Sequence, residues 1–151
     1  TYWRQLVTKR TYVALVEGKF AQKEGQITSW LTENPHTAMV SSSPVDNGGQ
    51  LAITHYKVLQ ELDSGLESPE SEISLVELNL ETGRTNQIRV HMASVGHPVV
   101  GDRKYGHGNE SSPIDRLCLH AKVLEFIHPM TEKKVRFEAA MPKEFTLLLR
   151  N

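Results

Sequence analysis

The segment from residue 76 to residue 96 changes its hydrophobic period halfway along, from that of a strand to that of a helix. Its first part alternates apolar and polar residues up to Thr82-Gly83, which is the pattern of a half-buried strand. Its second part has apolar residues at helical spacing and ends at Gly96, and Thr85 or Asn86 is placed to cap the helix start. The apolar positions are Val76, Leu78 and Leu80 in the strand and Ile88, Met92 and Val95 in the helix. A strand that passes through a tight turn into a helix commits the chain to a fold with both elements.

Other stretches of β-branched and alternating apolar residues predict further strands, over residues 11–16, 52–62, 117–121 and 135–139. A polar loop is expected over 41–49 and a short helix over 142–149, which has Pro at its first turn. Several strands and few helices, without regular strand–helix alternation, indicate an α+β fold with a mostly antiparallel mixed sheet.

The composition fits one soluble globular domain. The chain has 151 residues, 38% of them hydrophobic and 23% charged, which argues against disorder, and no apolar run is long enough to span a bilayer. Its one cysteine, Cys118, lies between two leucines and is expected to be a buried apolar residue rather than a reactive thiol. A single cysteine cannot form an internal disulfide, which favours a cytoplasmic location.

The net charge of −1 hides an uneven distribution. Residues 58–83 contain seven acidic residues and no Lys or Arg, so they carry −7 and leave +6 on the rest of the chain. A fold that places this acidic stretch on one side leaves a basic face for nucleic acid on the other. The alternative is that the acidic stretch is simply a solvated loop and strand face.

Residues 80–92 concentrate polar and basic side chains at the predicted helix start, namely Arg84, Gln87, Arg89 and His91. Backbone N–H groups at a helix N-terminus attract anions, and neighbouring arginines strengthen that attraction, so a phosphate or an acidic side chain would suit this site. The alternative is an ordinary solvated helix start.

A loop punctuated by Gly and Pro follows at residues 96–106 and carries Arg103, Lys104 and Tyr105. Two cations and an aromatic ring suit contact with RNA. The alternative is that the glycines and Pro98 only shape a turn, and that Asp102 caps it or pairs with a neighbour. The histidines and acids fit no zinc pattern, and the sequence has no phosphate-binding loop or dinucleotide fingerprint.

Taken together, these segments resemble the RluA-type RNA pseudouridine synthases. The resemblance is carried by Leu80-x-Thr82-Gly83-Arg84-x-x-Gln87-Ile88-Arg89-x-His91 and by Gly96-His97-Pro98-x-x-Gly101-Asp102-x-x-Tyr105-Gly106. Three further blocks agree in order and spacing: Lys9-Arg10-Thr11-Tyr12-Val13-Ala14-Leu15-Val16-x-Gly18, Ala52-x-Thr54-x-Tyr56-x-Val58, and Arg116-Leu117-x-Leu119-His120-Ala121 with Phe126-x-His128-Pro129. The match covers nearly the whole chain.

The resemblance implies that residues 1–151 are the C-terminal part of a pseudouridine synthase catalytic domain. Such enzymes isomerise uridine in ribosomal or transfer RNA without a cofactor or a metal. It also implies that Tyr12 lies against the flipped base and that Arg89 pairs with the catalytic aspartate. The residues expected to contact RNA are Arg84, Gln87, His91, Arg103, Lys104 and Leu119, the last packing near the base.

The chain departs from the family pattern in two ways. The His-Arg-Leu-Asp string that carries the family's nucleophile is absent, and Asn86 stands where the family usually has His. We therefore expect the nucleophile upstream of Thr1, the missing N-terminal half of the domain to be a partner of this chain, and the fragment to be inactive alone. Two alternatives stay open: a non-catalytic RNA-binding remnant of the same fold, and a protein-interaction module unrelated to RNA.

Overall fold

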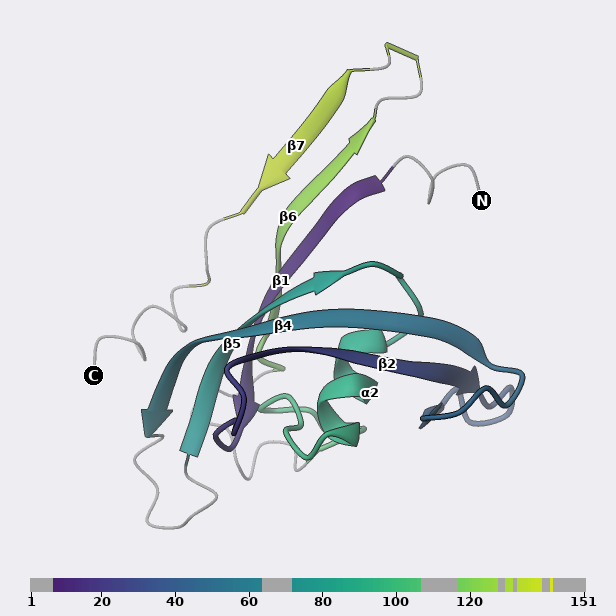
Figure 1. Ribbon diagram of the computed structural model, residues 1–151, viewed down its shortest axis with the longest axis vertical. Coiled ribbons are helices and arrows are strands. Elements are labelled where there is room, and N and C mark those ends of the chain that lie inside the picture. The colour runs from purple at the N-terminus through teal and green to yellow at the C-terminus, as the bar shows by residue number, and fades with distance from the viewer. Residues whose placement is uncertain are drawn as a thin grey trace.

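The fold is a seven-stranded sheet with one helix packed against it, in the part of the chain that the computed structural model describes: residues 7–63, 72–106, 117–127, 130–131, 133–139 and 142. The strand order is β3-β2-β4-β5-β1-β6-β7, and all of these neighbours pair antiparallel (Figure 1). The elements are β1 Val7–Glu17, β2 Glu24–Glu33, β3 Val40–Ser43, β4 Gln50–Asp63, β5 Glu72–Leu80, α2 Gln87–Ser94, β6 Leu119–Ile127 and β7 Lys134–Glu138. The expected α+β class with a mostly antiparallel sheet is confirmed.

Two strands near one edge of the sheet were not predicted. β2 had no predicted element, and the loop predicted over 41–49 is wrong at its start, because Val40–Ser43 pair with β2 as β3. In β2, Ile27, Ser29 and Leu31 are buried in alternation, but the middle position is polar and hides the strand pattern. The helix predicted over 142–149 lies outside the described residues except for its first residue.

Helix α2 packs on one face of the sheet (Figure 1), against β3 and β4 and, through His91 and Ser29, against β2. Ile88 and Met92 join a cluster with apolar residues of β1 and β5, whereas Val90 packs with residues of β2, β3 and β4. Burying an Ile or Met side chain stabilises the fold by roughly 1.5–3 kcal/mol, so these three residues fix the helix against the sheet. The partners are Ala14, Val16, Val76 and Leu78 in the first cluster and Leu31, Val40 and Ala52 in the second.

The centre of β1 is buried on both faces, and its continuous apolar run from Val13 to Val16 suits such a position. Val13 and Leu15 pack in a separate cluster that contains Val100 and Cys118, and this confirms that the cysteine is buried. Val100 donates a backbone hydrogen bond to Leu15 (2.8 Å), and Leu15 donates one to Cys118 (3.0 Å). These bonds hold residues 99–100 beside β1 and so fix where the loop 101–106 begins.

Candidate active-site cleft

A cleft of about 200 Å³ opens beside the start of α2, over β1, β5 and β6. Its walls are Tyr12, Leu80, Arg84, Asn86, Gln87, Ile88, Arg89 and Leu119. The structure thus brings together five residues that the sequence predicted for the site, namely Tyr12, Arg84, Gln87, Arg89 and Leu119. Tyr12 and Leu119 meet there because β1 pairs with β6 in a register that places Ala14 opposite Leu119. None of the described residues in this wall carries a carboxylate.

The turn that leads into α2 is held by the side chain of Gln87, which is 2% exposed. Its Oε1 accepts hydrogen bonds from the Thr82 hydroxyl (2.7 Å) and from the backbone N–H of Arg84 (3.1 Å). Its Nε2 donates to the Ile53 carbonyl (3.0 Å) and to the Thr54 hydroxyl (2.8 Å). Gln87 therefore links the turn to β4 and shapes the cleft wall while its own amide is fully engaged.

Asn86 is the N-cap residue, as the sequence allowed, but its side chain does not cap the helix. Its backbone is left-handed, with φ 54°, a conformation that Asn adopts more readily than most residues. Its Nδ2 instead donates to the hydroxyl of Tyr105 at 3.5 Å. The position that departs from the family pattern thus connects the helix start to the loop 101–106.

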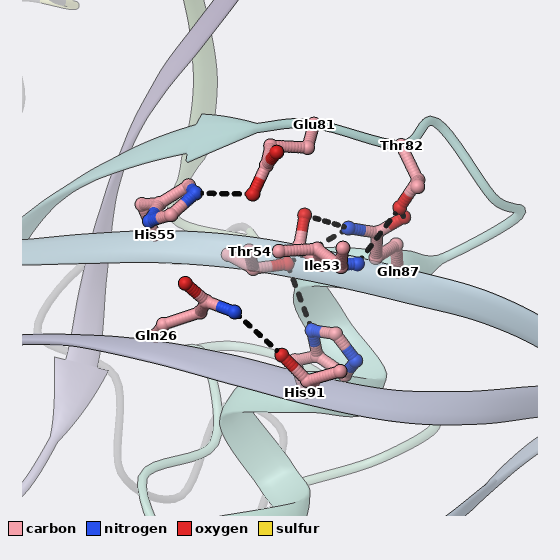
Figure 2. A network of polar contacts seen from close by, with 9 residues as sticks. Gln26, Ile53, Thr54, His55, Glu81, Thr82, Gln87 and His91 are labelled. Atoms are coloured by element: carbon pink, nitrogen blue, oxygen red, sulfur yellow. Dashed lines mark hydrogen bonds and ion pairs between the residues drawn. The ribbon is translucent and has the colours of Figure 1, made fainter.

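His91 lies on the side of α2 that faces the sheet and is 0% exposed. Figure 2 shows its ring reaching Thr54 on β4, with Gln87 and Thr82 continuing the chain of contacts. Nδ1 lies 2.8 Å from the Thr54 hydroxyl and Nε2 lies 2.9 Å from the Ser29 hydroxyl. Because Gln87 donates to Thr54, the Thr54 hydroxyl proton is free to donate to Nδ1, and Nε2–H then donates to Ser29.

Burial lowers the pKa of His91 to about 4, so the ring is neutral at pH 7. The expected contact between His91 and RNA is therefore corrected: the side chain is inside the core, and both ring nitrogens already have protein partners. The role of His91 in the sequence motif is to attach α2 to β2 and β4.

Arg89 lies on the cleft and pairs with Asp102, which is 0% exposed. Nε donates to Oδ2 at 2.9 Å and Nη2 donates to Oδ1 at 2.8 Å, and Oδ1 also accepts the backbone N–H groups of Lys104 (2.9 Å) and Tyr105 (3.0 Å). Burial by itself would raise the pKa of Asp102, but the hydrogen bonds from Arg89, Tyr105 and Lys104 bring it below its ordinary value. The hydrogen bond with Asp102 raises the pKa of Arg89 against the effect of burial. Both groups are charged at pH 7, and this is not an exposed surface pair.

Of the other predicted cations, Arg103 and Lys104 lie outside the cleft wall, near the start of α2. Lys104 and Arg103 are exposed; Lys104 Nζ donates to the Ala38 carbonyl (3.0 Å) and lies 5.6 Å from the centroid of the Tyr105 ring. Arg84 lines the cleft and donates from Nε to the Leu51 carbonyl at 2.9 Å. Arg103 and Lys104 therefore belong to a basic rim beside the cleft.

One basic residue near the cleft was missed from the sequence. The guanidinium of Arg10 packs over Gly83, where a Cβ atom would lie 3.1 Å from Nη1. Arg10 stands two residues before Tyr12 on β1, and residues two apart on a strand point to the same face. The two-residue spacing between Arg10 and Tyr12 could therefore have indicated Arg10 from the sequence.

Three acidic residues of 58–83 are paired with a Lys or His among the residues that the structure describes. Glu61 pairs with Lys23, and Glu72 lies 3.6 Å from Lys19. Glu81 lies 2.5 Å from His55, a contact visible in Figure 2 on β4. These pairs offset part of the acidic charge, whereas Arg84, Arg103 and Lys104 form no ion pair with a carboxylate among the described residues.

An aromatic ring, aliphatic walls and guanidinium groups suit a planar base joined to a sugar–phosphate chain. Within the described residues, no three His, Cys, Asp or Glu side chains are grouped closely enough to hold a metal ion. The same part of the chain contains no helix long and apolar enough to cross a membrane.

Comparison with known proteins agrees with this geometry. The family model for RNA pseudouridylate synthases matches residues 2–94. The uncharacterized RNA pseudouridine synthase YhcT of Bacillus subtilis is 43% identical over 143 residues, covering 94% of this chain and 44% of that protein. Ribosomal large subunit pseudouridine synthase D of Zymomonas mobilis is 36% identical over 148 residues, covering 93% of this chain and 44% of that protein.

A solved structure shows the same architecture. Human RNA Pseudouridylate Synthase Domain Containing 1 superposes with a TM-score of 0.75 at 27% identity, over 92% of this chain and 56% of that one. The chain therefore spans about half the length of the proteins that it matches. Five sequence blocks in order, a shared sheet with its helix, and a family match over more than half of the chain lead to one conclusion: this chain belongs to the RNA pseudouridylate synthase family.

Proposed function

We propose that the cleft is part of the active site of an enzyme that isomerises uridine to pseudouridine in RNA, and that residues 1–151 are the C-terminal part of its catalytic domain. The observation that carries the proposal is the convergence of Tyr12, Arg89 and Leu119 on one cleft from three separate elements. Because relatives are named as ribosomal large subunit synthases, ribosomal RNA is the proposed substrate, with transfer RNA as the second choice.

The reaction only rearranges bonds within the nucleotide. The C1′–N1 bond breaks, a C1′–C5 bond forms, the proton on C5 leaves, and N1 gains a proton. In this scheme Tyr12 lies against the base and assists removal of the C5 proton, while Leu119 packs against the ring. Arg89 presents its free N–H donors to a carboxylate that attacks the nucleotide, keeping that carboxylate ionised and oriented.

The attacking carboxylate is proposed to come from another part of the full-length protein. Among the described residues, the cleft wall contains no Asp or Glu, and Asp102 is fully buried with both oxygens bonded to other groups. We therefore propose that residues 1–151 alone bind RNA but do not isomerise it.

RNA binding is proposed to depend on the basic rim, formed by Arg103 and Lys104, and on Arg84 in the cleft wall. Arg84, Arg103 and Lys104 are assigned to phosphate contacts, which hold RNA without reading its sequence. Gln87 shapes the wall rather than touching the RNA, because its amide is fully engaged.

A second candidate function is a non-catalytic RNA-binding remnant of this fold, and the observation in its favour is that no carboxylate lines the cleft among the residues that the structure describes. Tritium release from RNA labelled at C5 of uracil separates the two. Release by the full-length protein and none by residues 1–151 supports the enzyme. Release by neither, with retained salt-sensitive RNA binding, supports the remnant. Clear turnover by residues 1–151 alone would contradict the proposed source of the nucleophile.

A further inference from the structure

The pairing of Arg89 with Asp102 is costly for a fold to maintain unless the geometry is good. A buried carboxylate loses its hydration, and an ion pair with one partner fully desolvated is seldom stabilising compared with apolar packing. Here the two Asp102 oxygens accept four hydrogen bonds, two from Arg89 and two from the backbone of the loop 101–106. The carboxylate is satisfied on every side that the structure describes.

The same bonds leave part of the Arg89 guanidinium unused. A guanidinium has five N–H donors, and Asp102 occupies one on Nε and one on Nη2. The three remaining donors belong to a side chain that is 22% exposed and lines the cleft. They are the donors available to a ligand or a carboxylate entering the cleft.

The plane of the guanidinium is fixed from a second direction by Tyr105. Arg89 Cζ lies 5.2 Å from the centroid of the Tyr105 ring. The Tyr105 hydroxyl accepts the backbone N–H of Val40 at 3.0 Å, which ties the ring to β3. Two bonds on one edge and an aromatic ring nearby therefore restrict Arg89 to one orientation.

From this geometry we propose that Asp102 is a positioning residue for the reaction: it holds the Arg89 guanidinium so that its three free donors face the cleft. The inference rests on the proposed function. Asp102 does not reach the cleft itself, so it acts through Arg89. The loop 101–106 is thereby given a role in the chemistry as well as a place beside the RNA.

Asp102→Asn tests the inference in the full-length protein. The variant keeps an oxygen for the backbone N–H groups, but it removes the charge and points an amide donor at the donors of Arg89. We expect kcat for tritium release to fall about 10- to 100-fold while KM changes by less than about threefold, because misorientation by about 1 Å can cost a factor of this size. The matched control is Asp46→Asn, which alters an exposed aspartate that accepts the backbone N–H of Gly48 at 3.0 Å. The control should retain the wild-type kcat.

A double-mutant cycle separates positioning from a general structural role. If Asp102 acts through Arg89, then Arg89→Lys together with Asp102→Asn should lower kcat no further than Arg89→Lys does alone, within about twofold. Multiplication of the two single effects would overturn the proposal, as would a wild-type kcat in Asp102→Asn.

Folding is checked by thermal melts of each variant. If Asp102→Asn does not fold, Asp102→Glu takes its place: it keeps the charge but moves the carboxylate by one methylene, and at least a tenfold loss in kcat is expected. A wild-type kcat in Asp102→Glu would overturn the proposal. Absence of turnover in the wild-type protein would overturn the proposed function and this inference with it, whereas wild-type turnover with an unaffected Asp102 variant would overturn this inference alone.

Discussion

Helix α2 carries two polar networks on different sides, and they differ in charge, burial and surroundings. The side toward β2 and β4 holds a neutral network built on His91 and Gln87, both of which are at most 2% exposed. The side toward the loop 101–106 holds the ionised pair of Arg89 and Asp102, and Arg89 opens onto the cleft. The neutral network attaches the helix to the sheet, whereas the charged one presents a cation to a ligand.

The physical cost of each network explains the division. Neutral groups that satisfy one another can be buried at modest cost, so they serve for attachment inside the core. A desolvated ion pair is a poor way to gain stability, and its presence beside a cleft indicates a task that needs fixed charge. The pKa directions agree: burial lowers the pKa of His91 to about 4 and keeps it neutral, while the Asp102 hydrogen bond raises the pKa of Arg89 and keeps it charged.

The largest expected effect is on turnover when the charged network is broken. Arg89→Ala in the full-length protein should lower kcat by about three orders of magnitude, or roughly 4 kcal/mol, because the attacking carboxylate loses its oriented partner. RNA affinity should change by less than about threefold, because several cations share the phosphate contacts. Tritium release and fluorescence anisotropy measure the two quantities. The matched control is Arg136→Ala, which removes an exposed guanidinium that pairs with Glu125. Equal losses of binding and turnover in Arg89→Ala would make Arg89 a plain RNA contact.

The next largest effect is expected from the neutral network: the free energy of unfolding should depend on pH through His91. His91 has a folded pKa of about 4 and an unfolded pKa near 6.5, so between these values the unfolded chain binds more protons. The contribution of neutral His91 to the free energy of unfolding is complete above pH 6.5, is lost as the pH falls toward 4, and amounts to about 3 kcal/mol at most.

Asp102 affects stability in a separate pH range. Its folded pKa is lowered, so its contribution to the free energy of unfolding is present above its unfolded pKa of about 3.9 and is lost only below that pH.

Urea unfolding of the full-length protein between pH 7.5 and 4.5 measures this dependence. His91→Gln should flatten the curve in that range, and His36→Gln, at an exposed position, should leave it unchanged. An unaltered slope in His91→Gln would show that His91 titrates normally and is not held neutral by the core.

A single hydroxyl in the neutral network should have a somewhat smaller effect. Thr54→Val keeps the shape of the side chain but leaves His91 Nδ1 without a donor and removes one acceptor from Gln87. Unsatisfied buried groups of this kind cost about 1–3 kcal/mol, measurable as a lower free energy of unfolding. Thr28→Val is the matched control, because Thr28 is exposed on β2 and its hydroxyl bonds only to exposed Gln26 among the described residues. Equal changes in the two variants would contradict a buried network.

The smallest effect concerns the basic rim. Affinity for single-stranded RNA should fall with salt with a logarithmic slope of about −0.7 per phosphate contact, and Lys104→Glu should flatten that slope by about one contact. Lys134→Glu, at an exposed position on β7, controls for net charge. Binding that is independent of salt, or unaffected by reversing Arg103 and Lys104 together, would count against this face.

The sequence predicted those strands and the helix whose hydrophobic pattern lies within a short stretch of residues. The apolar run of β1, the alternation in β5 and the spacing of α2 all lie in short stretches of sequence. β2 was not predicted because Ser29, a buried position in the strand, is polar. Ser29 is buried because its hydroxyl bonds to His91, which lies 62 residues away in the chain.

The candidate site was likewise predicted only in part. The family resemblance indicated Tyr12, Arg89 and Leu119, and these meet in one cleft. It did not indicate which side of α2 each polar residue would take. His91 and Arg89 are two residues apart, so the rotation of the helix sends one into the core and the other to the cleft, and Asp102 meets Arg89 only after residues 99–100 align with β1.

The most direct test of the two roles measures kcat for tritium release and the free energy of unfolding in parallel for Arg89→Lys and Thr54→Val, at a temperature where both are folded. We predict that Arg89→Lys lowers kcat at least tenfold with less than about 1 kcal/mol lost in stability. Thr54→Val should lose about 1–3 kcal/mol of stability and keep kcat within about threefold. If the variants exchange these outcomes, or if each loses both properties equally, the division of α2 into an attaching side and a presenting side is wrong.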